Sequence, residues 1–395
     1  MPEHREDPEA ERRLLAIAAA RMRSEGLTQA QIAKRLGKSQ PEVSRLVSYA
    51  EENQFLARSP SFLSQNVAAA DLKEADRRFF VHEELRKVLR KLAPDGLHLD
   101  VRVLPDGEEA FAAAAASCVS ELVRRARLVG IMWGRSLEGL VSRIRGCLDR
   151  PGQGESYQAQ CIPLCGDPVH LMNLRHVKFS ASHLAAELGQ AIKPGRPSDQ
   201  PCLVGVPAYL PRKFFLQRNG AAGWQDFVEG IPGYRLIFGP GNGKEKPWIE
   251  RVDTIISGTG IIARESHRQN HRESPADTAA FEKTGDFIRE RLTQEAGITE
   301  SALAKLIYGD IGGWLLGRRG LRADERRLVE SLNQGWTGIK GEQLAEVARN
   351  AQPAGAPGII LVAAGPAKAE MVREIVRKGF VNELLIDSSL STALQ

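Results

Sequence analysis

The feature that most constrains the fold is an alternation of short apolar runs with helical stretches, which begins at Leu99 and continues to the C-terminus. This alternation is typical of βαβ units, which build a mainly parallel sheet with helices on both faces. Ligands bind such sheets at the carboxyl ends of the strands. We expect strands at 99–104, 128–133, 202–206, 252–257, 359–363 and 383–386.

The chain is long enough for more than one domain. Its 395 residues, 42% of them hydrophobic, can bury a large core. After Phe55 comes Ala-Arg-Ser-Pro-Ser-Phe-Leu-Ser-Gln-Asn, a stretch of turn formers and small polar residues that is typical of an interdomain connection. We therefore divide the chain into a first domain at 1–58, a linker at 59–80 and a large α/β domain at 81–395. A charged helical segment, 72–92, overlaps the boundary, and its role is open.

Three helices are predicted before the linker, and the first two are separated by Gly26. Apolar residues recur at helical spacing from Pro8 to about Arg23, and Gly26 ends this run. Thr28 is the N-cap of the second helix, with Gln31 at the capping-box position. Gly37 then closes the second helix.

A third helix follows Ser39, another N-cap residue, with Pro41 in its first turn, where the missing N–H matters little. Two helices, a tight turn and a third helix form the helix-turn-helix pattern, whose last helix lies in the major groove of DNA. Residues 28–50 carry four basic side chains and one acidic one, so positive charge gathers where phosphates would lie. We expect DNA contacts from Thr28, Gln29, Ser39, Gln40, Ser44 and Arg45.

Three short helices also occur as protein interaction domains or as part of a helical bundle. The combination of caps, apolar core and local charge in one order favours DNA binding. Because the net charge of the whole chain is only +5, contact with nucleic acid must be local.

Composition and spacing exclude several other classes of protein. The longest apolar stretch, near 110–116, is far shorter than the roughly 18 residues of a membrane-spanning helix. The polar N-terminus lacks the pattern of a secretory signal, so we expect a cytoplasmic protein. Five cysteines, an odd number, do not resemble a disulfide framework, and we expect reduced thiols.

We expect no metal and no cofactor. Cys161 and Cys165 are too far apart for the usual zinc-binding spacing. His267 and His271 are one helical turn apart, but the charged segment around them is typical of a solvated surface.

Three of the expected strands end in glycine-rich turns: Trp133-Gly-Arg-Ser-Leu, Ser257-Gly-Thr-Gly-Ile and Ala364-Gly-Pro-Ala-Lys. Glycine lets the backbone approach an anion closely, and the N–H groups of a following helix favour negative charge. Each turn alone is a weak signal, since such turns usually serve chain reversal. Together they predict an anion site on one rim, which we assign to Gly134, Arg135, Ser136, Gly258, Thr259, Gly260, Asp310, Gly365 and Lys368.

In this site the phosphate would lie on the turn at residues 134–136, with a charge from Lys368. Asp310, in Tyr-Gly-Asp-Ile-Gly-Gly, would accept hydrogen bonds from sugar hydroxyls.

The order of these pieces resembles the SorC family of sugar-responsive transcription regulators. The resemblance covers most of the chain and rests on these segments: Leu-Thr-Gln-Ala-Gln-Ile-Ala-Lys-Arg-Leu-Gly at 27–37 with Val-Ser-Arg-Leu at 43–46, Gly-Ile-Met-Trp-Gly-Arg-Ser-Leu at 130–137, Gly-Val-Pro-Ala at 205–208, Tyr-Gly-Asp-Ile at 308–311, Ala-Ala-Gly-Pro-Ala-Lys-Ala-Glu at 363–370, and Val-Asn-Glu-Leu-Leu-Ile-Asp at 381–387. It implies a helix-turn-helix domain followed by a large Rossmann-like α/β effector domain similar to sugar-phosphate isomerases. It further implies a phosphorylated sugar as effector, with the turn at 134–136 and Lys368 in its site, and a homotetramer bound to operator DNA.

The sequence departs from the family pattern in three places. Gln40 follows Ser39 where an arginine is usual, so the operator sequence should differ. Ser-Gly-Thr-Gly at 257–260 stands where Gly-Ile-Gly is more usual, and residues 208–250 look longer than expected. Arg268, downstream of the segment at 257–260, is a further candidate cation, which we leave unassigned because its spacing is loose.

Two other functions remain open. A sugar-phosphate isomerase of similar fold would use a carboxylate base, for which Asp253, Asp310 and Asp387 are candidates. A regulator that has lost small-molecule sensing would also fit the altered loops. We favour a regulator over an enzyme, because an enzyme would not need the N-terminal unit.

Overall fold

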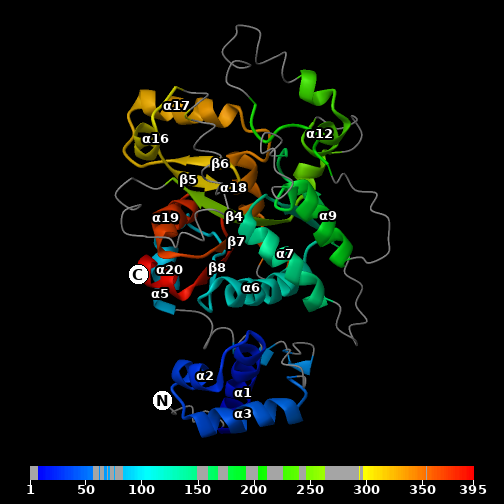
Figure 1. The fold of residues 1–395 in the computed structure, drawn as a ribbon, viewed down its shortest axis with the longest axis vertical. Helices are drawn as coiled ribbons and strands as arrows, with labels where there is room; N and C mark the ends of the chain where they lie inside the picture. Colours follow the sequence, from blue (N-terminus) through cyan, green and yellow to red (C-terminus); the bar gives the residue numbers. More distant parts are fainter. Residues whose placement is uncertain are drawn as a thin grey trace, which may run out of the picture.

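The computed structural model describes residues 8–56, 62, 66–68, 70–71, 75, 83–148, 159–167, 177–192, 203–210, 226–239, 246–262, 293, 297–352 and 354–395. Its helices and strands form a small helical unit at the N-terminus and a larger α/β body (Figure 1). Four residues considered above lie outside the described part of the chain: Cys202, His267, Arg268 and His271.

The N-terminal unit consists of α1 (Pro8–Ser24), α2 (Gln29–Leu36) and α3 (Gln40–Glu52). Both expected N-caps are confirmed, because Thr28 and Ser39 form reciprocal capping boxes with Gln31 and Glu42. Gly37 ends α2 in the left-handed conformation, at φ 62°. The expected order of two helices, a tight turn and a third helix is therefore confirmed.

The large body is built on a parallel sheet, as the alternation of apolar runs predicts. Its strand order is β1–β8–β7–β4–β2–β3, and each neighbouring pair is parallel. The strands are β1 (Asp100–Leu104), β8 (Glu383–Asp387), β7 (Gly358–Ala363), β4 (Thr254–Ile261), β2 (Leu128–Ile131) and β3 (Gln160–Pro163).

Helices cover both faces of this sheet (Figure 1). On one face α6 (Glu108–Val123), α7 (Arg135–Leu148) and α9 (Ala181–Ile192) pack in a row. On the other face lie α19 (Ala369–Arg377) and α20 (Ser388–Leu394). The remaining described helices are α5 (Glu83–Arg90), α12 (Pro232–Ile237), α16 (Glu300–Leu306), α17 (Ala323–Gln334) and α18 (Gly341–Arg349), with short 3-10 turns η3 (Trp248–Arg251) and η4 (Pro366–Lys368).

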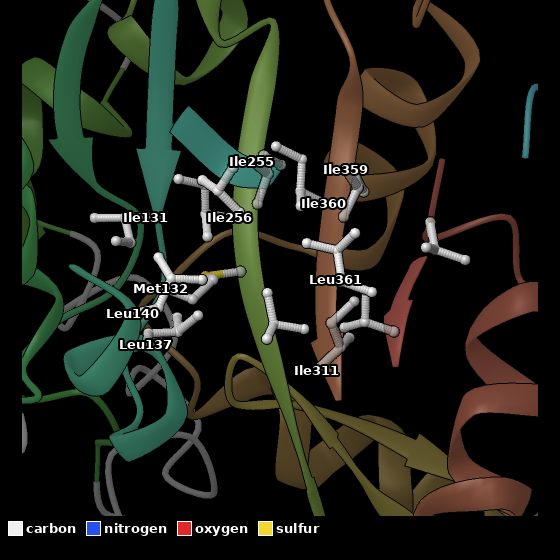
Figure 2. Close-up of a cluster of buried hydrophobic side chains, with 14 of the residues drawn as sticks. Ile131, Met132, Leu137, Leu140, Ile255, Ile256, Ile311, Ile359, Ile360 and Leu361 are labelled. Carbon is white, nitrogen blue, oxygen red and sulfur yellow. The ribbon is translucent and has the colours of Figure 1, made fainter. Parts of the chain in front are cut away.

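The central strands are apolar on both sides because both of their faces are covered. Figure 2 shows this core, in which Leu137 and Leu140 of α7 lie beside Met132 at the end of β2. Ile256 of β4 and Leu361 of β7 belong to the same buried cluster. This packing fixes where β2 ends and α7 begins, which is the first of the glycine-rich turns.

One expected turn is instead a strand. The segment Gly258–Gly260 continues β4, and residues 259–261 pair antiparallel with 311–309 of β5 (Ile307–Ile311), which forms a hairpin with β6 (Trp314–Gly317). A Cβ at Gly260 would overlap the Asp310 carboxylate, and one at Gly309 would overlap the backbone of Gly260. These glycines permit close strand pairing rather than chain reversal.

The other strand predictions are mostly confirmed. Residues 203–206 form no strand, and Pro207 and Tyr209 make only isolated bridges, to Asp167 and Trp336. Sequence periodicity did not predict β3, β5 or β6, which are only four or five residues long.

The described part of the chain can be compared with the expectations about membrane helices, metal sites and cysteines. No helix there is long and apolar enough to cross a bilayer, and no cluster of metal-ligating side chains gathers there. The thiols of Cys118 and Cys165 are buried and form no disulfide.

Candidate functional site

The first candidate surface is the N-terminal end of α3. Gln40, Ser44 and Arg45 are exposed there, while Val43 and Leu46 face the core of the unit. Among the other expected contacts, Thr28 and Ser39 are exposed and Gln29 is half-buried. The predicted base-reading side chains of α3 are therefore free to meet an external partner.

Capping holds the start of α3 in place. The Ser39 hydroxyl and backbone N–H both donate to Glu42, at 2.6 and 2.8 Å. These hydrogen bonds lower the pKa of Glu42. Glu42 therefore stays ionised at the helix start, where negative charge is favoured, while the exposed Arg45 keeps positive charge on the outer face.

The second candidate site is the rim at the carboxyl ends of the parallel strands. The chain leaves β2 into α7 on one face of the sheet and leaves β7 into α19 on the other. β4 lies between these two strands. Sheets of this kind bind ligands where the connections that leave the strands change from one face to the other.

The first turn on this rim joins β2 to α7. Gly134 has φ +144° and its N–H donates to the Phe179 carbonyl oxygen at 3.0 Å. Arg135 and Ser136 follow as the first residues of α7, and both are exposed. An exposed arginine and hydroxyl at a helix N-terminus can bind a phosphate.

The second turn joins β7 to α19. Gly365 has φ +94° and donates its N–H to both oxygens of Asp387, at 3.0 and 3.1 Å. Burial lowers the pKa of Lys368, and the cation of Arg135 acts in the same direction, while Asp310 and Asp387 oppose it. Lys368 and Arg135 thus act on each other electrostatically, from two different turns of the rim.

Asp310 supplies a carboxylate to the same rim. Its Oδ2 accepts the Gly313 N–H at 2.7 Å, and its carbonyl oxygen accepts the Thr259 hydroxyl at 2.8 Å. Burial raises the pKa of Asp310 to about 6, and the Gly313 N–H and Lys368 act against this shift. A buried carboxyl of this kind can accept or donate hydrogen bonds near neutral pH.

The structure brings the expected rim residues together from four segments. Gly260 pairs with Asp310 between β4 and β5. Lys368 interacts electrostatically with both Asp310 and Arg135. Gly365 belongs to the same turn as Lys368, and Ser136 to the same turn as Arg135.

Sequence reasoning missed an aromatic cluster that contacts Gly313, the residue whose N–H binds Asp310. Tyr209, Trp133 and Trp336 are buried, with the Trp336 ring centroid 4.9 Å from that of Tyr209 and 6.0 Å from that of Trp133. The Tyr209 hydroxyl donates to the Gly313 carbonyl oxygen. These residues come from three distant segments, so no local motif could reveal them.

The three carboxylates considered as a catalytic base, Asp253, Asp310 and Asp387, all accept hydrogen bonds, but they lie in different places. Asp253 precedes β4 and accepts the N–H groups of Arg127 and Leu128, so it lies at the amino ends of the strands, opposite the rim. Asp387 caps α20 through the Leu390 N–H. Asp253 and Asp310 therefore cannot act on one substrate.

Comparison with known proteins shows what this fold is similar to. No protein-family model matches the chain, and no curated protein matches it. The full-length sorbitol operon regulator SorC from Klebsiella pneumoniae superposes with a TM-score of 0.52 at 18% identity, over 97% of this chain and 99% of that one. A domain of a possible sugar-binding transcriptional regulator from Arthrobacter aurescens TC1 gives 0.49 at 17% identity, over 80% of this chain and 98% of that one.

The first of these likenesses spans both units of the chain in the same order. It confirms the expected fold class, in which a helix-turn-helix unit precedes a large α/β domain.

Proposed function

We propose that this chain is a DNA-binding transcription regulator of a carbohydrate-metabolism operon, controlled by a phosphorylated sugar bound at the strand rim. The observation that carries the proposal is that one chain contains both a capped helix-turn-helix unit and an α/β domain. The rim of that domain contains the two cations Arg135 and Lys368. One solved structure that is similar over 97% of this chain is a sorbitol operon regulator.

The chemistry of the rim supports a phosphorylated effector. Two cations from different turns, together with the N-terminus of α7, favour a dianion. The Asp310 carboxylate, which interacts electrostatically with Lys368, suits the hydroxyl groups of a sugar. We assign effector contacts to the turn at 134–136, to Asp310 and to the turn at 365–368.

Thermal unfolding against a panel of phosphorylated sugars and their unphosphorylated parents tests this proposal. A ligand at one hundred times its dissociation constant should stabilise the chain by about 2.7 kcal/mol. Stabilisation by phosphorylated compounds alone supports the anion site. Stabilisation by none would favour a regulator that works through protein contacts.

For the mechanism, we infer a homotetramer in the cytoplasm in which effector binding shifts the balance between subunit arrangements. The spacing of the α3 helices relative to the operator half-sites would change with it. If the effector altered neither the oligomer nor the DNA affinity, this mechanism would be wrong.

An isomerase remains the second candidate, and Asp310 is the observation in its favour. Its pKa of about 6 suits a general base near neutral pH. Incubating each stabilising sugar phosphate with the chain and analysing the products distinguishes the two, because a regulator returns the compound unchanged.

A further inference from the structure

The helix-turn-helix unit and the α/β body meet in a contact that the proposed function does not use. Figure 1 shows α1 below α6. Arg21 and Glu25, at the end of α1, are only 4% and 5% exposed. Charged side chains are almost never this buried unless they are paired.

Arg21 bridges the two units. Its Nη2 donates to Cys118 Sγ on α6 at 3.3 Å, and its Nε lies 3.4 Å from Glu25 Oε1. Burial raises the pKa of the Cys118 thiol, Arg21 lowers it and Glu25 raises it. All three groups therefore share one buried environment, to which the helix-turn-helix unit contributes Arg21 and Glu25 and the α/β body contributes Cys118.

A second bond joins the units at the edge of the sheet. Among the described strands β1 lies at the end of the order, so no described strand pairs with the carbonyl groups on its outer side. Arg35 of α2 donates to one of them, the Val103 carbonyl oxygen, at 3.4 Å. We call the contact formed by Arg21, Glu25, Arg35, Val103 and Cys118 the interdomain joint.

Hydrogen bonds connect the other end of α6 to the rim. Asp106, just before α6, accepts the Ser389 N–H at 3.1 Å. The Ser389 hydroxyl donates to Asp387 at 2.9 Å, and Asp387 accepts the Gly365 N–H. The rim thus connects to the start of a rigid helix whose later turns contact α1.

We propose that the interdomain joint sets the position of the helix-turn-helix unit on the α/β body, and that the rim acts on it through Asp387, Ser389 and Asp106. Arg35 is also one of the basic residues expected near DNA phosphates, so the closed joint withholds one cation from DNA. The link to the rim rests on the proposed function, whereas the joint rests on its own contacts.

Alkylation of Cys118 by N-ethylmaleimide, followed by peptide mass spectrometry on the full chain, measures opening of the joint. Cys118 is 1% exposed and its sulfur contacts Arg21. Arg35→Ala should accelerate its alkylation about three- to tenfold, as expected for one lost hydrogen bond. Lys34→Ala is the matched control, because Lys34 is the exposed neighbour on the same helix. Equal rates in the two variants would overturn the joint.

A second variant tests the joint from α1. Arg21→Met leaves the Glu25 charge buried, which should open the joint and speed alkylation about tenfold or more. Because Arg21 lowers the thiol pKa, its loss alone would slow the reaction. Faster alkylation therefore reports exposure. Cys161 and Cys165, buried in the α/β body, should stay unreactive and show that it is folded.

The link to the rim has its own test. Asp106→Ala removes the acceptor for Ser389 and should speed Cys118 alkylation about threefold. Glu109→Ala, an exposed carboxylate in the first turn of α6, should not. Equal rates for these two would overturn the link. If instead no sugar phosphate stabilised the chain, the proposed function would fail while these rates still tested the joint.

Discussion

At the strand rim, the Asp310 carboxyl group and the Lys368 ammonium group each reduce the pKa shift that burial causes in the other. Burial raises the pKa of Asp310 to about 6 and lowers that of Lys368, and each group partly counters the effect on the other. Their elements, β5 and η4, are far apart in the chain. The rim therefore holds a charge pair whose balance changes near neutral pH.

The first prediction concerns pH and stability. In the folded chain the pKa of Asp310 lies above its usual value of 3.8. The protonated carboxyl therefore contributes fully to the free energy of unfolding below pH 3.8, and this contribution is lost as the pH rises through about 6. The loss is of the order of 3 kcal/mol. Asp310→Asn keeps an acceptor for the Gly313 N–H but cannot ionise, so it should be more stable than the wild type at pH 7.5.

Urea unfolding at pH 4 and pH 7.5 measures this effect. The difference in the free energy of unfolding between the variant and the wild type should approach zero at pH 4, where the wild-type carboxyl is protonated. A constant difference at both pH values would show that Asp310 does not ionise in this range.

The second prediction concerns the effector. Lys368→Met should abolish the thermal stabilisation by phosphorylated sugars, because it removes a cation from the rim, and it should spare DNA binding. Lys378→Met is the matched control, since Lys378 is exposed at the end of α19. Ser136→Ala should act in the same direction as Lys368→Met. Loss of DNA binding in either rim variant, with the fold intact, would contradict this division of roles.

The third prediction concerns DNA. Arg45→Ala should weaken binding by about 1–3 kcal/mol, because an exposed arginine on the recognition helix can read a guanine edge. Fluorescence anisotropy with a duplex selected from random sequences by the wild-type chain measures this. Arg319→Ala removes the same charge from an exposed site on the α/β body and should leave affinity unchanged. An equal loss in both variants would point to general electrostatics instead.

The fourth prediction compares two glycines. Gly365 has φ +94° with open space around it, so Gly365→Ala should destabilise the chain by about 1–2 kcal/mol through backbone strain alone. Gly146 lies within α7, also in open space, and Gly146→Ala should stabilise it by about 0.5–1 kcal/mol. Differential scanning calorimetry should show shifts of opposite sign. Two shifts of the same sign would mean that the turn at Gly365 can relax.

The sequence by itself determined the local structure of this protein. The caps at Thr28 and Ser39 were predictable because a capping box is a contact between residues three apart. The strands near β1, β2, β7 and β8 were predictable because buried parallel strands are short apolar runs. The glycine turns at Gly134 and Gly365 were predictable because each directly follows such a run.

Only the tertiary structure decided which of these pieces meet. Pairing with β7 and β5 made a strand of Gly258–Gly260, although the same residues also suit a turn. The charge pair of Asp310 and Lys368, the ring cluster around Trp336 and the contact of Arg21 with Cys118 all join distant segments. Such contacts depend on strand order and helix packing, which burial of the whole core selects and which no short stretch of sequence contains.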